Sequence, residues 1–220
     1  MFSGDTLINL LYSVPAILIA LSFHEYFHGL VSTLLGDDVP RLQGRLSLNP
    51  FRHLDLWGSL FMVLTSLSGM GFGWAKPVMV NPNRYKINKK VGMMLVAIAG
   101  PAANVLLAMI AGYLYYLINS GLIPYNEYFS TFFAIFMTLN ISLAAFNILP
   151  IPPLDGSKVL AIILPNHMAG KIYSAGQYFI LILLVLSFTG LLGKIMTPIF
   201  MGLWNFVNFV VIQTFNILPL

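Results

Sequence analysis

The sequence predicts an all-α polytopic membrane protein with about five to six transmembrane helices, a re-entrant segment and a small β-hairpin. Hydrophobic residues make up 58% of the 220 residues and charged residues only 8%, whereas an ordinary soluble domain has about 25% charged residues. A single water-soluble core cannot hide this much apolar surface. Long apolar runs, each close to the roughly 20 helical residues that cross a bilayer, point to the same fold class.

The predicted transmembrane helices follow these runs in order. They lie near residues 7–34, 91–118, 129–149, 174–192 and 195–216. The first run has no basic segment before it and no obvious small-residue cleavage site after it, so we expect a retained span rather than a signal peptide. No repeat or linker interrupts the chain. We therefore expect residues 1–220 to form one membrane domain.

A sixth apolar run, at 56–72, is shorter and rich in Gly and Ser, and the charge pattern decides how it is interpreted. Lys and Arg gather in segments 36–55, 76–90 and 157–171, which the positive-inside rule places in the cytoplasm. Residues 56–72 should then enter and leave the membrane by one face, as a re-entrant element packed against protein. The same rule puts the N-terminus outside. It also explains the net charge of +4 without a nucleic-acid partner.

The segment 39–50, VPRLQGRLSLNP, is too broken for a span. Its short alternating runs and its Gly, Asn and Pro residues predict a small β-hairpin. Residues 74–83 have a similar pattern, so we expect two extended pieces to flank the re-entrant segment.

Residues 24–28, HEYFH, form an H-E-x-x-H motif inside the first apolar run. At helical spacing His24 and His28 share one face, so both imidazoles can reach one metal ion, while Glu25 can accept a proton from water at that ion. Charged side chains deep in a membrane helix cost about 2.5–3.5 kcal/mol and are usually functional. The alternative is a pair of interfacial histidines beside a glutamate that reaches toward water.

A catalytic zinc ion takes three protein ligands and keeps one position open, and the chain has no cysteine to supply the third ligand. Asp155 is the best candidate, because it follows a proline-rich stretch that ends the run 129–149 at a depth similar to that of His28. Irregular backbone at membrane depth is expected only where it lines a site. Alternatively, Asp155 could serve as an N-cap for a helix over 157–164.

Four stretches of the chain are similar to motifs of one family. Three of them match its patterns in the order of the chain: HEYFH, GPAAN at Gly100–Asn104 and NILPIPPLDG at Asn147–Gly156. The fourth, SLNPFRHLDLWG at Ser47–Gly58, resembles a further motif of one branch. The chain resembles the site-2 protease (M50-type) family of intramembrane zinc metalloproteases, in the short bacterial-type branch that lacks PDZ and CBS domains. The resemblance covers roughly residues 15–165.

The resemblance implies a three-helix catalytic core within about 7–165, followed by a helix pair over about 174–216. It implies one zinc ion held by His24, His28 and Asp155, with Glu25 as general base. It also implies that Asn147 binds the extended substrate backbone and that Asn104 lies near the site. Either amide could bind substrate or support the transition state by donating to the developing oxyanion; both asparagines could instead be hydrogen-bonding contacts between helices. The implied substrates are transmembrane or membrane-associated proteins of a bacterial cell membrane, cut toward the cytoplasmic side.

Two other classes remain alternatives. Buried His and carboxylate residues also mark ion pathways, so a metal-ion transporter is the first alternative. Paired related halves, typical of transporters, are not visible, and a glutamate next to the first histidine suits hydrolysis better than conduction. The second alternative is a catalytically inactive binding protein of the same fold, although His24, Glu25, His28 and Asp155 are all present.

Overall fold

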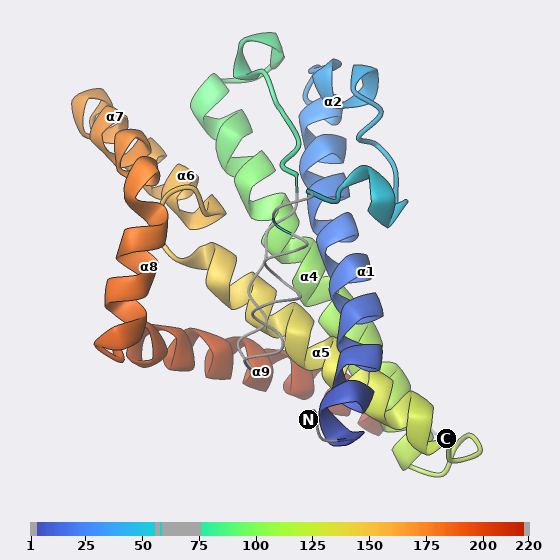
Figure 1. Ribbon diagram of the computed structural model, residues 1–220. Coiled ribbons are helices and arrows are strands. Elements are labelled where there is room, and N and C mark those ends of the chain that lie inside the picture. The colour runs from blue at the N-terminus through green and yellow to red at the C-terminus, as the bar shows by residue number, and fades with distance from the viewer. Residues whose placement is uncertain (1–3, 56–57, 59–75, 218–220) are drawn as a thin grey trace.

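The computed structural model describes residues 4–55, 58 and 76–217, and the regular elements in this part of the chain are helices, apart from an isolated β-bridge residue at Leu54. Three long helices form the middle of the molecule (Figure 1): α1 (Gly4–Leu34), α4 (Lys89–Asn119) and α5 (Glu127–Ile148). The remaining elements are α2 (Val39–Leu42), η1 (Pro50–Arg52), η2 (Pro82–Arg84), α6 (Asp155–Ile163), α7 (Asn166–Ala175), η3 (Gly176–Tyr178), α8 (Phe179–Phe188) and α9 (Leu191–Ile217).

Five stretches of the described chain are long and apolar enough to cross a membrane, which confirms the five runs predicted from hydropathy. They are Leu10–Leu34, Lys89–Asn119, Glu127–Ile148, His167–Phe188 and Leu191–Asn216. The fourth is made of α7, η3 and α8 in succession. The protein is therefore an integral membrane protein of helical architecture.

Helices α1, α4 and α5 pack against one another around a core of small and branched residues. Alanines occupy the closest contacts, because a methyl side chain lets helix backbones approach within the bilayer. Ala16 and Ala20 of α1 meet Ala108 and Ala111 of α4, and Ile141 of α5 completes the cluster, all with no exposed surface.

Helix α9, the last element in the chain order, packs against α4 and α5 of this core. Val207 and Val211 are buried against α4 and α5, and the Tyr113 hydroxyl donates to the Thr214 Oγ1 atom at 2.6 Å. In Figure 1, α9 runs from the foot of α8 to the lower ends of α4 and α5. The C-terminal helix therefore braces the three-helix core.

The β-hairpin expected over residues 39–50 is not present. The segment begins with the short helix α2 and ends at η1, with turns and irregular chain between them. Pro40 lies at the start of α2, where its fixed φ favours a helical turn, and the Asp37 carboxylate accepts a hydrogen bond from the Val39 amide. Gly44 then reverses the chain at a φ of 66°. Proline and a local turn thus outweigh the short alternating pattern.

Residues 76–81, the described part of the second expected extended piece, carry neither helix nor strand. They run alongside α1, as the contacts of Glu25 and Asp37 described below show. The proposed re-entrant segment 56–72 lies outside the described residues, apart from Gly58.

Candidate metal centre

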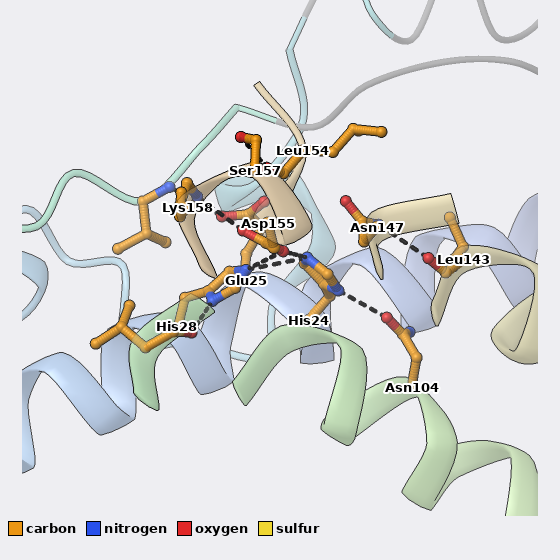
Figure 2. Close-up of polar contacts among 12 residues, drawn as sticks. His24, Glu25, His28, Asn104, Leu143, Asn147, Leu154, Asp155, Ser157 and Lys158 are labelled. Atoms are coloured by element: carbon orange, nitrogen blue, oxygen red, sulfur yellow. Dashed lines mark hydrogen bonds and ion pairs between the residues drawn. The ribbon is translucent and has the colours of Figure 1, made fainter. Parts of the chain in front are cut away.

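His24 and His28 lie one turn apart on α1, and Asp155 reaches them from the first turn of α6 (Figure 2). The Asp155 Oδ2 atom is 3.1 Å from the His24 Nε2 atom and 3.0 Å from the His28 Nε2 atom, and the two nitrogen atoms are 3.0 Å apart. All three side chains are buried. The structure thus brings together the three residues that the sequence marked as metal ligands.

The partners of the two histidine rings determine what the three converging atoms can do. The His28 Nδ1 atom lies 2.6 Å from the Val96 carbonyl oxygen, which can only accept, so Nδ1 carries the hydrogen. The His24 Nδ1 atom lies 2.7 Å from the Asn104 Oδ1 atom, which indicates the same tautomer. In the neutral rings both Nε2 lone pairs then face a carboxylate oxygen. Three acceptors at this separation repel one another unless a cation lies among them.

The residues present fit a zinc ion. Two imidazole nitrogens and one carboxylate oxygen form the ligand set of many catalytic zinc sites. Bonds of about 2.0–2.2 Å in a tetrahedron separate the ligand atoms by about 3.3–3.6 Å, slightly more than the observed 3.0 to 3.1 Å. A shift of a few tenths of an ångström would accommodate the ion.

Gly100 of α4 leaves the space in front of the two rings open. A Cβ atom at this position would lie 2.5 Å from the His28 Nε2 atom and 2.6 Å from the His24 Nε2 atom. Any side chain would therefore collide with the atoms that face the metal position. This close approach explains the glycine of the GPAAN stretch.

Asp155 is the first residue of α6, and it does not cap that helix. The N-cap is Leu154, without a side-chain hydrogen bond to the helix. The Asp155 Oδ1 atom instead pairs with the Lys158 Nζ atom at 2.7 Å, which leaves Oδ2 for the histidines. The positive charge of Lys158 beside Oδ1 favours the ionised carboxylate, which is the form in which an aspartate binds a metal.

Gly156 allows the sharp turn that brings Asp155 back to α1. A Cβ atom there would run into the carbonyl groups of Ile148 and Leu149 at the end of α5. The chain therefore folds back on itself immediately after α5, and this places the start of α6 beside α4 and α1.

Glu25 follows His24 on α1, and its Oε2 atom accepts a hydrogen bond from the Val78 backbone amide at 2.9 Å. The segment that carries Val78 is fixed by Asp37, which is fully buried and accepts from the Asn81 amide at 2.7 Å and from the Ser32 hydroxyl at 2.9 Å. One carboxylate oxygen of Glu25 is therefore anchored by the loop, and the loop is in turn anchored to α1.

The two asparagines predicted near the site have different surroundings. Asn104 is fully buried, and its Nδ2 atom donates to the Ala20 carbonyl at 3.2 Å and to the Asn140 Oδ1 atom at 2.9 Å. Both ends of its amide are thus taken by protein groups. Asn147 donates to the Leu143 carbonyl of its own helix at 3.0 Å (Figure 2).

Sequence reasoning missed Lys158, Asp37 and Asn140, all of which support the candidate site through the hydrogen bonds and ion pair of their side chains. Of these three residues, only Asn140 could have been found from the sequence, because it is a single amide within an apolar run where unpaired polar groups are costly. His53 is also buried, at 1% exposed, with its Nε2 atom 2.6 Å from the Ser47 carbonyl oxygen.

Comparison with known proteins shows the family. The model of peptidase family M50 matches residues 123–192. "Putative zinc metalloprotease YwhC" of Bacillus subtilis (strain 168) is 37% identical over 191 residues, which cover 85% of this chain and 84% of that protein. "Putative zinc metalloprotease Rip2" of Mycolicibacterium smegmatis is 30% identical over 80% of this chain and 66% of its own length.

A protein also named "Putative zinc metalloprotease Rip2", from Mycobacterium tuberculosis (strain ATCC 25618 / H37Rv), is 29% identical over 84% of this chain and 71% of its own length. No solved structure matches the chain. The similarity to YwhC spans most of both chains and agrees with the buried His, His and Asp cluster at the centre of the fold. The chain therefore belongs to peptidase family M50, the site-2 protease family of membrane zinc metalloproteases.

Proposed function

We propose that the protein is a zinc-dependent intramembrane endopeptidase in which His24, His28 and Asp155 hold one zinc ion and Glu25 is the general base. The observation that carries the proposal is the convergence of three buried acceptor atoms 3.0 to 3.1 Å from one another, with Glu25 next to the first of them on α1. A structural cluster would be expected to contain a donor for these acceptors. A metal site needs the acceptors and nothing more.

Zinc, when bound, supplies a Lewis acid that polarises the scissile carbonyl and makes water easier to deprotonate. Glu25 takes the proton from the attacking water and returns it to the amine nitrogen of the leaving chain. The Val78 amide holds one oxygen of Glu25, and the other oxygen accepts no hydrogen bond from the residues that the structure describes, so it is the one proposed for this transfer. Lys158 keeps Asp155 turned toward the histidines.

The substrates in this proposal are transmembrane or membrane-associated proteins. A helix hides its backbone carbonyls in internal hydrogen bonds, so the bond to be cut must first unwind. The segment 76–81 offers backbone groups beside Glu25 to which an extended substrate can pair. Asn147 is proposed to hold the other side of the substrate, because its amide is engaged only with its own helix among the contacts that the structure describes.

The first test is the zinc content of purified variants. His24→Ala, His28→Ala and Asp155→Ala should each bind less than one zinc ion per chain and lose cleavage, because each removes one of only three protein ligands. His167→Ala is the matched control, since that histidine is exposed on α7 and is not part of the His24, His28 and Asp155 cluster. Full zinc content in the Asp155→Ala protein would mean that the third ligand lies elsewhere.

We further propose that the N-terminus lies outside and that the site faces the cytoplasmic side of the bacterial cell membrane. The support is the charge pattern: Lys and Arg are concentrated in 36–55, 76–90 and 157–171, and 119–128 contains none. His28, near the end of α1, and Asp155, at the start of α6, both adjoin the basic segments.

The orientation is tested by single cysteines, because the native chain contains none. Gln43→Cys and Asn88→Cys should react with an impermeant thiol reagent from the cytoplasmic side, and Asn126→Cys from outside. All three positions are exposed. Labelling of positions 43 and 88 from opposite sides would make 56–72 a true span and exclude the re-entrant arrangement.

A further inference from the structure

The Asn104 amide, which contacts His24, also contacts a second buried amide, that of Asn140. Asn140 occupies the middle of α5 and has no exposed surface, as does Asn104 on α4. Two buried amides in an otherwise apolar helix core are costly unless their hydrogen-bonding groups are satisfied. Here they bond to each other, between the Asn104 Nδ2 atom and the Asn140 Oδ1 atom at 2.9 Å.

The contacts of Asn140 define which way its amide faces. The Asn140 Nδ2 atom donates to the Phe136 carbonyl oxygen at 2.8 Å, and a carbonyl oxygen can only accept. The Asn140 Oδ1 atom must therefore face Asn104, and the Asn104 NH₂ group must donate to it. The Ala20 carbonyl, 3.2 Å from the same Asn104 nitrogen, requires the same orientation. The Asn104 oxygen is left facing the His24 Nδ1 atom at 2.7 Å.

The orientation of Asn104 controls the tautomer of His24. With an oxygen opposite, the His24 Nδ1 atom carries the hydrogen and the Nε2 atom keeps its lone pair for a metal. An Asn104 amide turned by 180° would present NH₂ to Nδ1 and favour a hydrogen on Nε2, the atom that faces Asp155. His28 needs no such support, because its Nδ1 partner is the Val96 carbonyl of the backbone, which cannot turn.

We propose that Asn140 is a positioning residue that, by fixing the direction of the Asn104 amide, keeps the His24 Nε2 atom free to bind zinc. This inference rests on the proposed function, since it assumes that His24 is a zinc ligand. It assigns Asn104 to the orientation of a ligand rather than to the transition state. We call these hydrogen bonds the amide relay. It connects all three core helices, from Phe136 and Asn140 on α5 through Asn104 on α4 to His24 on α1.

The test is zinc affinity, measured by competition with a chelator on the purified, detergent-solubilised full chain. Asn140→Leu keeps the size of the side chain and removes the relay, and it should weaken zinc binding by about 10-fold, the lower end of what loss of a supporting group around a metal ligand costs. Asn208→Leu is the control, because Asn208 donates to the Trp204 carbonyl of its own helix but supports no ligand. Asn140→Asp, which still presents an acceptor to Asn104, should bind zinc like the wild type.

A double substitution separates orientation from general packing. Asn104→Asp presents an oxygen to His24 whichever way it turns, so adding Asn140→Leu to it should cause no further loss of zinc affinity. Equal losses from Asn140→Leu in the wild-type chain and in the Asn104→Asp variant would overturn the proposal, as would an unchanged affinity in the single variant. If Asn140→Leu does not fold, Asn140→Ala is compared with Asn140→Asp, and equal affinities would likewise overturn it. A wild-type chain that binds no zinc would instead refute the proposed function.

Discussion

Glu25→Gln should abolish cleavage of membrane proteins while the purified protein keeps its zinc. Glutamine can still accept the hydrogen bond from the Val78 amide, which Glu25 accepts at 2.9 Å, so the loop should stay in place. It cannot take a proton from water, and loss of a general base costs about 10²- to 10⁴-fold in rate. The measurement pairs zinc analysis with cleavage of candidate single-span proteins in reconstituted membranes.

Glu127→Gln is the matched control, since Glu127 is the only other glutamate in the sequence and is exposed at the start of α5. It should cleave like the wild type. If Glu25→Gln lost zinc together with activity, Glu25 would be a ligand and the division of roles would be wrong. If it retained zinc and cleaved at the wild-type rate, the base would be another group, and Glu25 would serve only to bind the loop.

The parts of the fold and site that the sequence predicted depend on local regularities. Hydropathy located the five spans because a helix in lipid needs a continuous apolar stretch whatever its neighbours are. His24 and His28 could be paired because four residues make about one helical turn. Asp155 could be proposed because zinc needs a third ligand and the proline-rich stretch before it ends α5.

The parts that the sequence did not predict depend on contacts between distant segments or on a balance of weak local preferences. No periodicity reveals that Asp37 accepts from the amide of Asn81, or that Asn104 meets both His24 and Asn140. The alternating pattern at 39–50 suggested strands, but Pro40 and the Asp37 carboxylate favour the helical turn of α2 instead. Lys158 lies three residues after Asp155, yet its role became visible only when Asp155 proved to start a helix.

Gly100→Ala should lower zinc affinity by at least about 100-fold, the upper end of what displaced supporting groups cost, and should abolish cleavage with it. The new Cβ atom would lie 2.5 Å from the His28 Nε2 atom and 2.6 Å from the His24 Nε2 atom. Either the rings or α4 must move. Alanine favours a helix over glycine by about 1 kcal/mol, and this gain offsets part of the roughly 1–3 kcal/mol that overpacking costs, so thermal stability should change little compared with zinc affinity. Zinc affinity and stability are both measured on the purified chain.

Gly112→Ala provides the comparison on the same helix. Its Cβ atom would meet the side-chain ends of Val211 and Met137 at 3.1 and 3.2 Å, where α4 packs against α9 and α5, so zinc binding should be unaffected. Equal zinc loss in both variants would mean that α4 tolerates no added methyl group and that Gly100 has no special relation to the metal. Normal zinc binding in Gly100→Ala would remove His24 and His28 as a joint metal site, because the added methyl group occupies the space immediately beside the two atoms that must bind the ion.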